Sequence, residues 1–98
     1  MDFQLVKNQT GLPEAQCLSA AWSEGVAFID FLKRRFAATV VDRAEGPDAR
    51  VWKLQIEGKA IKVNQWDTGD LSVSVEERGA GELISKIVDC ARELEPTR

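Results

Sequence analysis

Apolar and polar residues alternate along much of this chain, and their period of two predicts five β-strands. The alternation is imperfect near the N-terminus and clearest after the middle of the chain. The expected strands cover 3–7, 39–41, 51–57, 60–66 and 71–76. Turn-forming residues separate the last four, so we expect these strands to form an antiparallel meander.

The turn between the third and fourth strands leaves two registers open. A two-residue turn at 57–58 or at 58–59 is expected from the glycine there. It would pair Leu54 with Ile61 or with Val63, and both choices keep the apolar residues on one face. The hairpin itself is therefore predicted independently of its register.

The loop between the last two strands can be tested more closely. A loop of two or four residues would set Val63 beside a serine, so we predict a loop of three residues. Lys62 would then lie across from Glu76, which gives an opposite-charge pair on the outer face. The other predicted partners are Gln65 with Val73, Val63 with Val75, and Trp66 with Ser72.

Apolar residues at steps of three and four predict two helices. The first should begin near Pro13, because proline lacks the N–H that a first turn leaves unbonded. Gly25 within it costs about 1 kcal/mol relative to alanine, and a kink or two helices meeting near Ser23 is the alternative. The expected buried face comprises Leu18, Trp22, Val26, Ile29, Leu32 and Phe36, widened by Ala21, Phe28 and Phe31. The second helix should bury Leu83, Ile84, Ile87, Val88, Ala91 and Leu94 and end before Pro96.

Together these elements predict the α+β class. The expected architecture is a two-layer sandwich with a mainly antiparallel sheet, in the order β-α-β-β-β-β-α, and with two helices packed on one face. The 98 residues fit a single domain, 1–98, with one hydrophobic core. Hydrophobic residues make up 44% and charged residues 30%, which favours a soluble globular protein over a disordered one.

Charge and cysteine content restrict the expected partners and location. A net charge of −3 provides no strong positive field, so we expect no nucleic-acid partner. No apolar stretch approaches the length of a membrane span and no secretory signal begins the chain, which predicts a cytoplasmic protein without a membrane partner. Cys17 and Cys90 are then expected to be free and to line the core.

The missing residue types limit the possible chemistry further. The chain has no His and no Tyr, which excludes His-containing nucleophile triads and imidazole zinc sites. Asp67-Thr68-Gly69 matches the aspartic protease tripeptide, but that chemistry needs a second such aspartate, and a hairpin turn explains the residues. We therefore expect no enzymatic activity, no cofactor and no metal. An enzyme would have to rest on carboxylates such as Glu24, Asp30, Asp67 or Asp70.

The outer face of the predicted sheet is the expected binding surface. It collects Lys53, Gln55, Lys62, Asn64, Trp66, Ser72 and Ser74, and no third helix is predicted to cover it. An exposed tryptophan among polar groups is typical of a recognition patch. We therefore expect a non-catalytic protein-binding or regulatory module that contacts a protein partner, or itself as a homodimer, through this face or an edge strand. The predicted contact residues are Trp66, Lys62, Asn64, Lys53 and Gln55.

A small-ligand-binding domain is the alternative. Its pocket would lie between the long helix and the sheet, because the chain's large aromatic residues could line a cavity as well as fill a core. The expected lining residues are Trp22, Phe28, Trp52 and the two cysteines.

Overall fold

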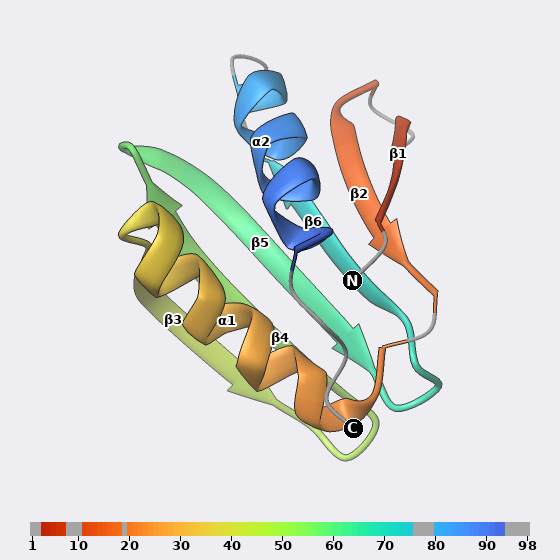
Figure 1. Ribbon diagram of the computed structural model, residues 1–98. Coiled ribbons are helices and arrows are strands. Elements are labelled where there is room, and N and C mark those ends of the chain that lie inside the picture. Colours follow the sequence, from red (N-terminus) through yellow and green to blue (C-terminus); the bar gives the residue numbers. More distant parts are fainter. Residues whose placement is uncertain (1–2, 8–10, 19, 76–79, 94–98) are drawn as a thin grey trace.

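A computed structural model of the chain describes residues 3–7, 11–18, 20–75 and 80–93, and it contains six strands and two helices in this part (Figure 1). In chain order they are β1 (Gln4–Lys7), β2 (Pro13–Cys17), α1 (Trp22–Phe36), β3 (Thr39–Glu45), β4 (Ala49–Ile56), β5 (Lys59–Trp66), β6 (Leu71–Val75) and α2 (Gly81–Ala91). The predicted α+β class and the two-layer arrangement are confirmed.

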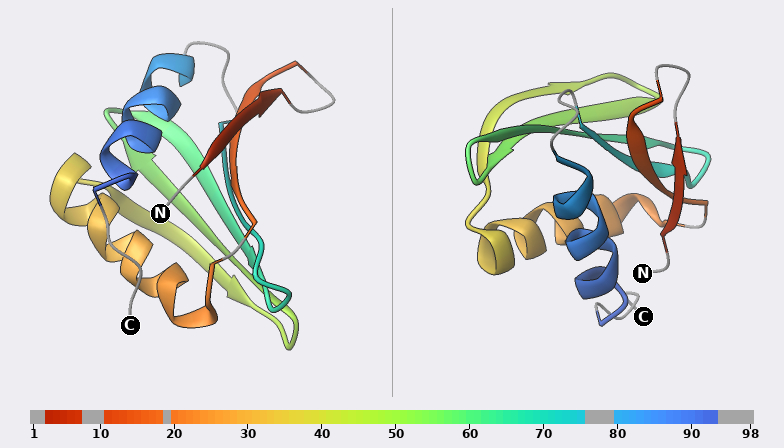
Figure 2. Two further views of the ribbon diagram at one scale, coloured as in Figure 1. Left: turned by 45° about the vertical axis from the view of Figure 1, so that its right-hand side comes forward. Right: turned by 90° about the horizontal axis from the view of Figure 1, so that it is seen from above.

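The strands form one antiparallel sheet in the order β1-β2-β6-β5-β4-β3. Both helices lie on the same face of this twisted sheet, as Figure 2 shows from above. Helix α1 packs against β5, and α2 packs against β1, β2 and β6. Neither helix in the described part of the chain has the length and apolar character that a membrane span requires.

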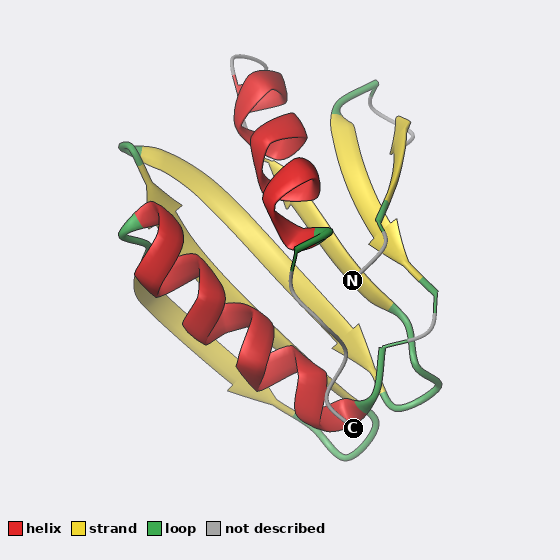
Figure 3. Ribbon diagram, in the orientation of Figure 1, coloured by secondary structure: helices red, strands yellow, loops and turns green. Residues whose placement is uncertain are grey.

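The prediction that a helix begins near Pro13 is wrong, because this segment is the strand β2 (Figure 3). Proline is tolerated as the first residue of a strand, where Pro13 stands. Ala15 and Cys17 are buried on the inner face, and Glu14 alternates with them on the outer face. The observed order is therefore β-β-α-β-β-β-β-α, with one strand more than expected.

The buried face of the first helix also differs from the prediction. Helix α1 begins at Trp22, so neither a longer helix nor two helices meeting near Ser23 is present. Phe28, Ile29 and Leu32 are buried as expected. Trp22 and Val26, expected on this face, are exposed, and so is Leu18, which precedes the helix. The helix is rotated so that Gly25 faces the sheet instead.

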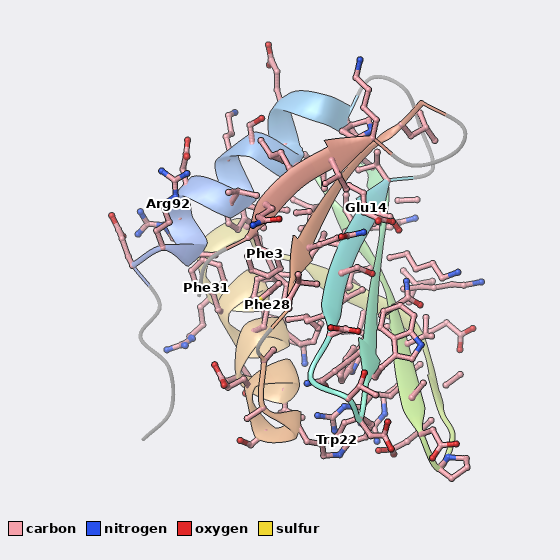
Figure 4. All side chains as sticks on the ribbon, turned by 90° about the vertical axis from the view of Figure 1, so that its right-hand side faces the viewer. Phe3, Glu14, Trp22, Phe28, Phe31 and Arg92 are labelled. Atoms are coloured by element: carbon pink, nitrogen blue, oxygen red, sulfur yellow. The ribbon has the colours of Figure 1, made fainter. Side chains whose placement is uncertain are left out.

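The core lies between the two layers. Phe28 is fully buried there, and its ring centroid lies 5.2 Å from that of Phe3. Figure 4 shows both rings between the helices and the sheet. Helix α2 contributes the predicted residues Leu83, Ile84, Ile87, Val88 and Ala91, all buried, whereas Leu94 and Pro96 lie outside the described residues. Both cysteines are free; Cys17 is buried and Cys90 is half-buried.

A buried polar cluster joins the start of α1 to the sheet. Arg50 on β4 donates from Nε to Gln65 Oε1 on β5 at 2.8 Å, and from Nη2 to the carbonyl oxygen of Trp22. The Gln65 amide nitrogen donates to the carbonyl oxygen of Ala21 at 2.9 Å. A Cβ on Gly25 would come within 1.9 Å of Gln65 Oε1, so the absence of a side chain at this position makes room for the amide.

The guanidinium of Arg50 also contacts aromatic rings. It lies 3.9 Å from the ring centroid of Trp22 and 5.0 Å from that of Trp52. Burial lowers the pKa of Arg50, while the carboxylate of Glu45, 3.9 Å from Nη1, acts in the opposite direction. The two tryptophan rings, the Gln65 amide and the Glu45 carboxylate thus replace the water that the Arg50 guanidinium loses on burial.

The β4–β5 hairpin adopts the first of its two possible turns. Glu57 and Gly58 form the two-residue turn, and Leu54 pairs with Ile61. Both turn residues have positive φ, 54° for Glu57 and 77° for Gly58, as a type I′ turn requires.

Glu57→Asn is expected to raise the free energy of unfolding by about 0.5–1 kcal/mol, because asparagine tolerates the left-handed conformation better than glutamate does. Urea denaturation followed by circular dichroism measures this change. Glu57→Ala serves as the control, since it removes the same charge without favouring positive φ. A midpoint for the asparagine variant that is no higher than that of the alanine variant would contradict the expectation.

The β5–β6 loop has the predicted three residues, but the predicted register is wrong by two. Trp66 donates its backbone N–H to the carbonyl oxygen of Asp70 at 2.9 Å, which closes the loop Asp67–Gly69. Gly69 has a φ of 103°, and a glycine with positive φ commonly ends a three-residue hairpin loop. The observed pairs are Gln65 with Leu71, Val63 with Val73, and Lys62 with Ser74 in place of Glu76.

Candidate functional site

Three neighbouring strands, β2, β6 and β5, arrange the outer face of the sheet in rows. Antiparallel partners point to the same face, so the register places Gln16, Ser72 and Asn64 side by side in one row. The next row holds Glu14, Ser74 and Lys62. On the other side of the first row, at the strand ends, lie Leu18, Asp70 and Trp66.

A hollow of about 390 Å³ lies over these strands. Ser72 on the middle strand has a small side chain and lies between the larger side chains of Gln16 and Asn64, and all three line the hollow. A furrow along β6 results. The lining residues are Glu14, Gln16, Leu18, Asn64, Trp66, Thr68, Asp70, Leu71 and Ser72. Figure 4 shows Glu14 on the side of the sheet away from the helices.

The hollow combines an apolar rim with hydrogen-bonding groups. Leu18 and Trp66 are 64% and 42% exposed, so two large apolar side chains border it in contact with solvent. Ser72 is only 7% exposed, and its hydroxyl makes no hydrogen bond to any other described residue. The site therefore presents apolar surface next to a polar group that is available for a ligand.

Charges are distributed unevenly around the hollow. Glu14 and Asp70 contribute two carboxylates to its lining; Glu14 accepts a hydrogen bond from Gln16 Nε2 at 2.7 Å. Asp70 is contacted by the Thr68 hydroxyl at 3.4 Å. None of the described residues that line the hollow is basic. It is therefore an acidic pocket on the outer face of the sheet.

The structure brings together only part of the predicted contact set. Trp66 is exposed and lines the hollow with Asn64, and Lys62 lies on the same face one row away. Lys53 and Gln55 are exposed on β4, outside the lining. Lys53 pairs directly with Lys62, so a positive strip adjoins the acidic hollow.

Sequence reasoning missed the residues from β2, because that segment was predicted to be helical. Glu14, Gln16 and Leu18 could have been found from the alternation of Ala15 and Cys17 with polar neighbours, had Pro13 not favoured a helix start. Trp66 was expected across from Ser72 but lies across from Asp70, which moves that carboxylate into the site.

The predicted lining of a pocket between the helix and the sheet is dispersed in the structure. Phe28, Trp52 and Cys17 belong to the buried core, whereas Trp22 covers Arg50. A hollow of about 140 Å³ lies in this region, lined by Val26, Ile29, Asp30, Lys33, Val40, Arg43 and Trp52. No group of three potential metal ligands occurs within the described ranges.

Comparisons with protein-family models, with curated proteins and with solved structures found no match to this chain.

Proposed function

We propose that this chain is a non-catalytic protein-binding module that uses the open outer face of its sheet, with the furrow over β6 as the centre of the contact. The observation that carries the proposal is the hollow bordered by the exposed side chains of Trp66 and Leu18. Both described helices lie on the opposite face and leave this surface open.

The composition of the face supports binding to a protein. Interface centres are enriched in tryptophan and combine it with hydrogen-bonding groups, and here Trp66 borders Asn64 and Ser72. The exposed Lys53 and Gln55, together with Lys62, would form a polar rim around that centre. A partner is thus expected to bury Trp66 and to pair with the lysines at the margin.

We also propose that the module works in the cytoplasm. Two free cysteines in a small domain fit a reducing compartment, where disulfides rarely persist.

Trp66→Ala is expected to weaken partner binding by about thirtyfold or more, the effect of losing a central aromatic contact. Because Trp66 is part-exposed, its removal should change the free energy of unfolding by no more than about 1 kcal/mol. The measurement compares affinity capture by tagged wild type and Trp66→Ala, followed by titration calorimetry with the purified partner. Val41→Ala is the matched control, because Val41 is a 61% exposed apolar residue on β3, away from the hollow.

Retention of the partner by Trp66→Ala, or its equal loss from Val41→Ala, would refute the proposed face. Light scattering on the eluted wild type tests for a second copy as partner. A dimer that becomes a folded monomer only in Trp66→Ala would identify that partner as the chain itself.

A further inference from the structure

We infer that the hollow over β6 takes an arginine side chain of the partner protein. This inference rests on the proposed function and names the group that the site recognises. It draws on the charge of the lining, on the exposed tryptophan at the rim, and on a guanidinium site that the same sheet already holds on its other face.

The charged residues that line the hollow favour a cationic ligand. Glu14 and Asp70 provide the two charged groups among the described lining residues, and both are carboxylates. The side-chain carbonyl oxygens of Gln16 and Asn64 and the hydroxyl of Ser72 add neutral acceptors to the same small volume. An anionic side chain would meet repulsion here, whereas a cation with several N–H groups could be bonded on more than one side.

The planar shape of guanidinium fits the other half of the site. Trp66 and Leu18 present apolar surface at the rim, and arginine both stacks on tryptophan rings and buries its own aliphatic stem on such surface. Lysine offers a compact, strongly hydrated charge and cannot form the same stacked, forked contact. The combination of ring, amides and carboxylates therefore favours arginine over lysine.

The inner face of the sheet holds a guanidinium with the same groups. Arg50 lies 3.9 Å from the ring centroid of Trp22, 2.8 Å from the amide oxygen of Gln65 and 3.9 Å from a carboxylate oxygen of Glu45. The outer hollow repeats this set of tryptophan, amide and carboxylate around an open space, with no basic residue among its described lining residues. An arginine from outside would supply the missing cation.

The test titrates the isotope-labelled protein with acetyl-Gly-Arg-Gly-amide and follows the indole N–H of Trp66 and the side-chain amides of Gln16 and Asn64 by NMR. The matched ligand replaces arginine by citrulline, which keeps the shape and removes the charge. We expect the arginine peptide to bind about three- to tenfold more tightly, with the difference shrinking at high salt. The corresponding lysine peptide should bind more weakly than the arginine peptide.

Two serine variants locate the binding. Ser72→Leu fills the furrow and should abolish the shifts, whereas Ser74→Leu, on the same strand but outside the lining, should keep them. The double variant Glu14→Gln with Asp70→Asn should bind the arginine and citrulline peptides equally. Because it leaves the furrow open, this result does not depend on a bulky substitution. The dispersion of the backbone spectrum reports folding for each variant.

Equal binding of the arginine and citrulline peptides, absence of shifts at Trp66, or loss of binding in Ser74→Leu alone would overturn the inference. These outcomes differ from a failure of the proposed function. Partner capture that depends on Trp66 but shows no arginine preference would leave the protein-binding face standing and reject arginine as its ligand.

Discussion

Gly25→Ala is expected to lower the free energy of unfolding by about 3–5 kcal/mol, although alanine is the better helix former. The added Cβ would come within 1.9 Å of Oε1 and 2.5 Å of Cδ of Gln65. Gln65 is fully buried and bonded on both sides, to Arg50 and to Ala21, so it cannot move away without breaking hydrogen bonds. Overpacking and the loss of buried polar contacts therefore act together.

Urea denaturation of wild type and variant measures this loss. Gly46→Ala is the matched control, because a Cβ there would meet only the carbonyl oxygen of Ala49 at 3.6 Å, an ordinary contact. The control should shift the free energy of unfolding by less than about 1 kcal/mol. If Gly25→Ala were as stable as Gly46→Ala, that result would contradict the close approach of α1 to Gln65 described above.

Gln65→Leu should destabilise the fold by about 2–4 kcal/mol, even though it places an apolar residue in a buried position. Leucine cannot accept from Arg50 Nε or donate to the carbonyl oxygen of Ala21. The Nε donor of a buried charge therefore loses its acceptor, and the carbonyl oxygen of Ala21 keeps only the backbone N–H of Glu24. Only 7% of Arg50 is exposed, so water cannot readily replace the amide.

A double-mutant cycle separates this loss from the change in packing. Arg50→Met removes the charged donor that Gln65 accepts from. In that background, Gln65→Leu should therefore lower the free energy of unfolding by at least about 1 kcal/mol less than it does in the wild type. Thermal or urea unfolding of the four proteins provides the comparison. Strictly additive values would show that the Arg50–Gln65 hydrogen bond contributes nothing specific to stability.

The sequence was sufficient to predict the α+β class, the β4–β5 hairpin and the buried face of α2. Each of these depends on apolar residues that recur with a single clear period, as Leu54, Ile61 and Ile87 do. Local pattern and final burial agree there, because the buried residues near the hairpin turn and those along α2 are apolar.

The prediction failed where the buried face is not apolar. Helix α1 buries Gly25 and leaves Trp22 and Val26 exposed, because Gln65 and Arg50 occupy the space beneath its first turns. The periodicity considers apolar residues only, so it predicted a buried face that includes Trp22 and Val26. The close approach that requires a glycine comes from a residue on another strand, which no local pattern contains.

The candidate site was predicted only in part for a similar reason. Shifting β6 by two residues keeps every side chain on its own face, so the pattern could not distinguish the register that pairs Gln65 with Val73 from the observed one with Leu71. Gly69 carries the better signal, since its positive φ fixes the end of the loop. The β2 side of the furrow comes from a pairing between distant segments that no local pattern indicates.

The pairing of β2 with β6 links ligand binding in the furrow to local opening of the sheet between these two strands. Strands β3 to β6 follow one another along the chain through short turns. Within the sheet, by contrast, the hairpin of β1 and β2 pairs with them only through β2 and β6, which are far apart in sequence. One wall of the furrow, Gln16, therefore belongs to the strand pairing that is most distant in sequence, and the opposite wall, Asn64, belongs to the meander. A ligand that bridges both walls favours the closed arrangement by its whole binding free energy, and any opening of the hairpin weakens that ligand's apparent affinity in proportion.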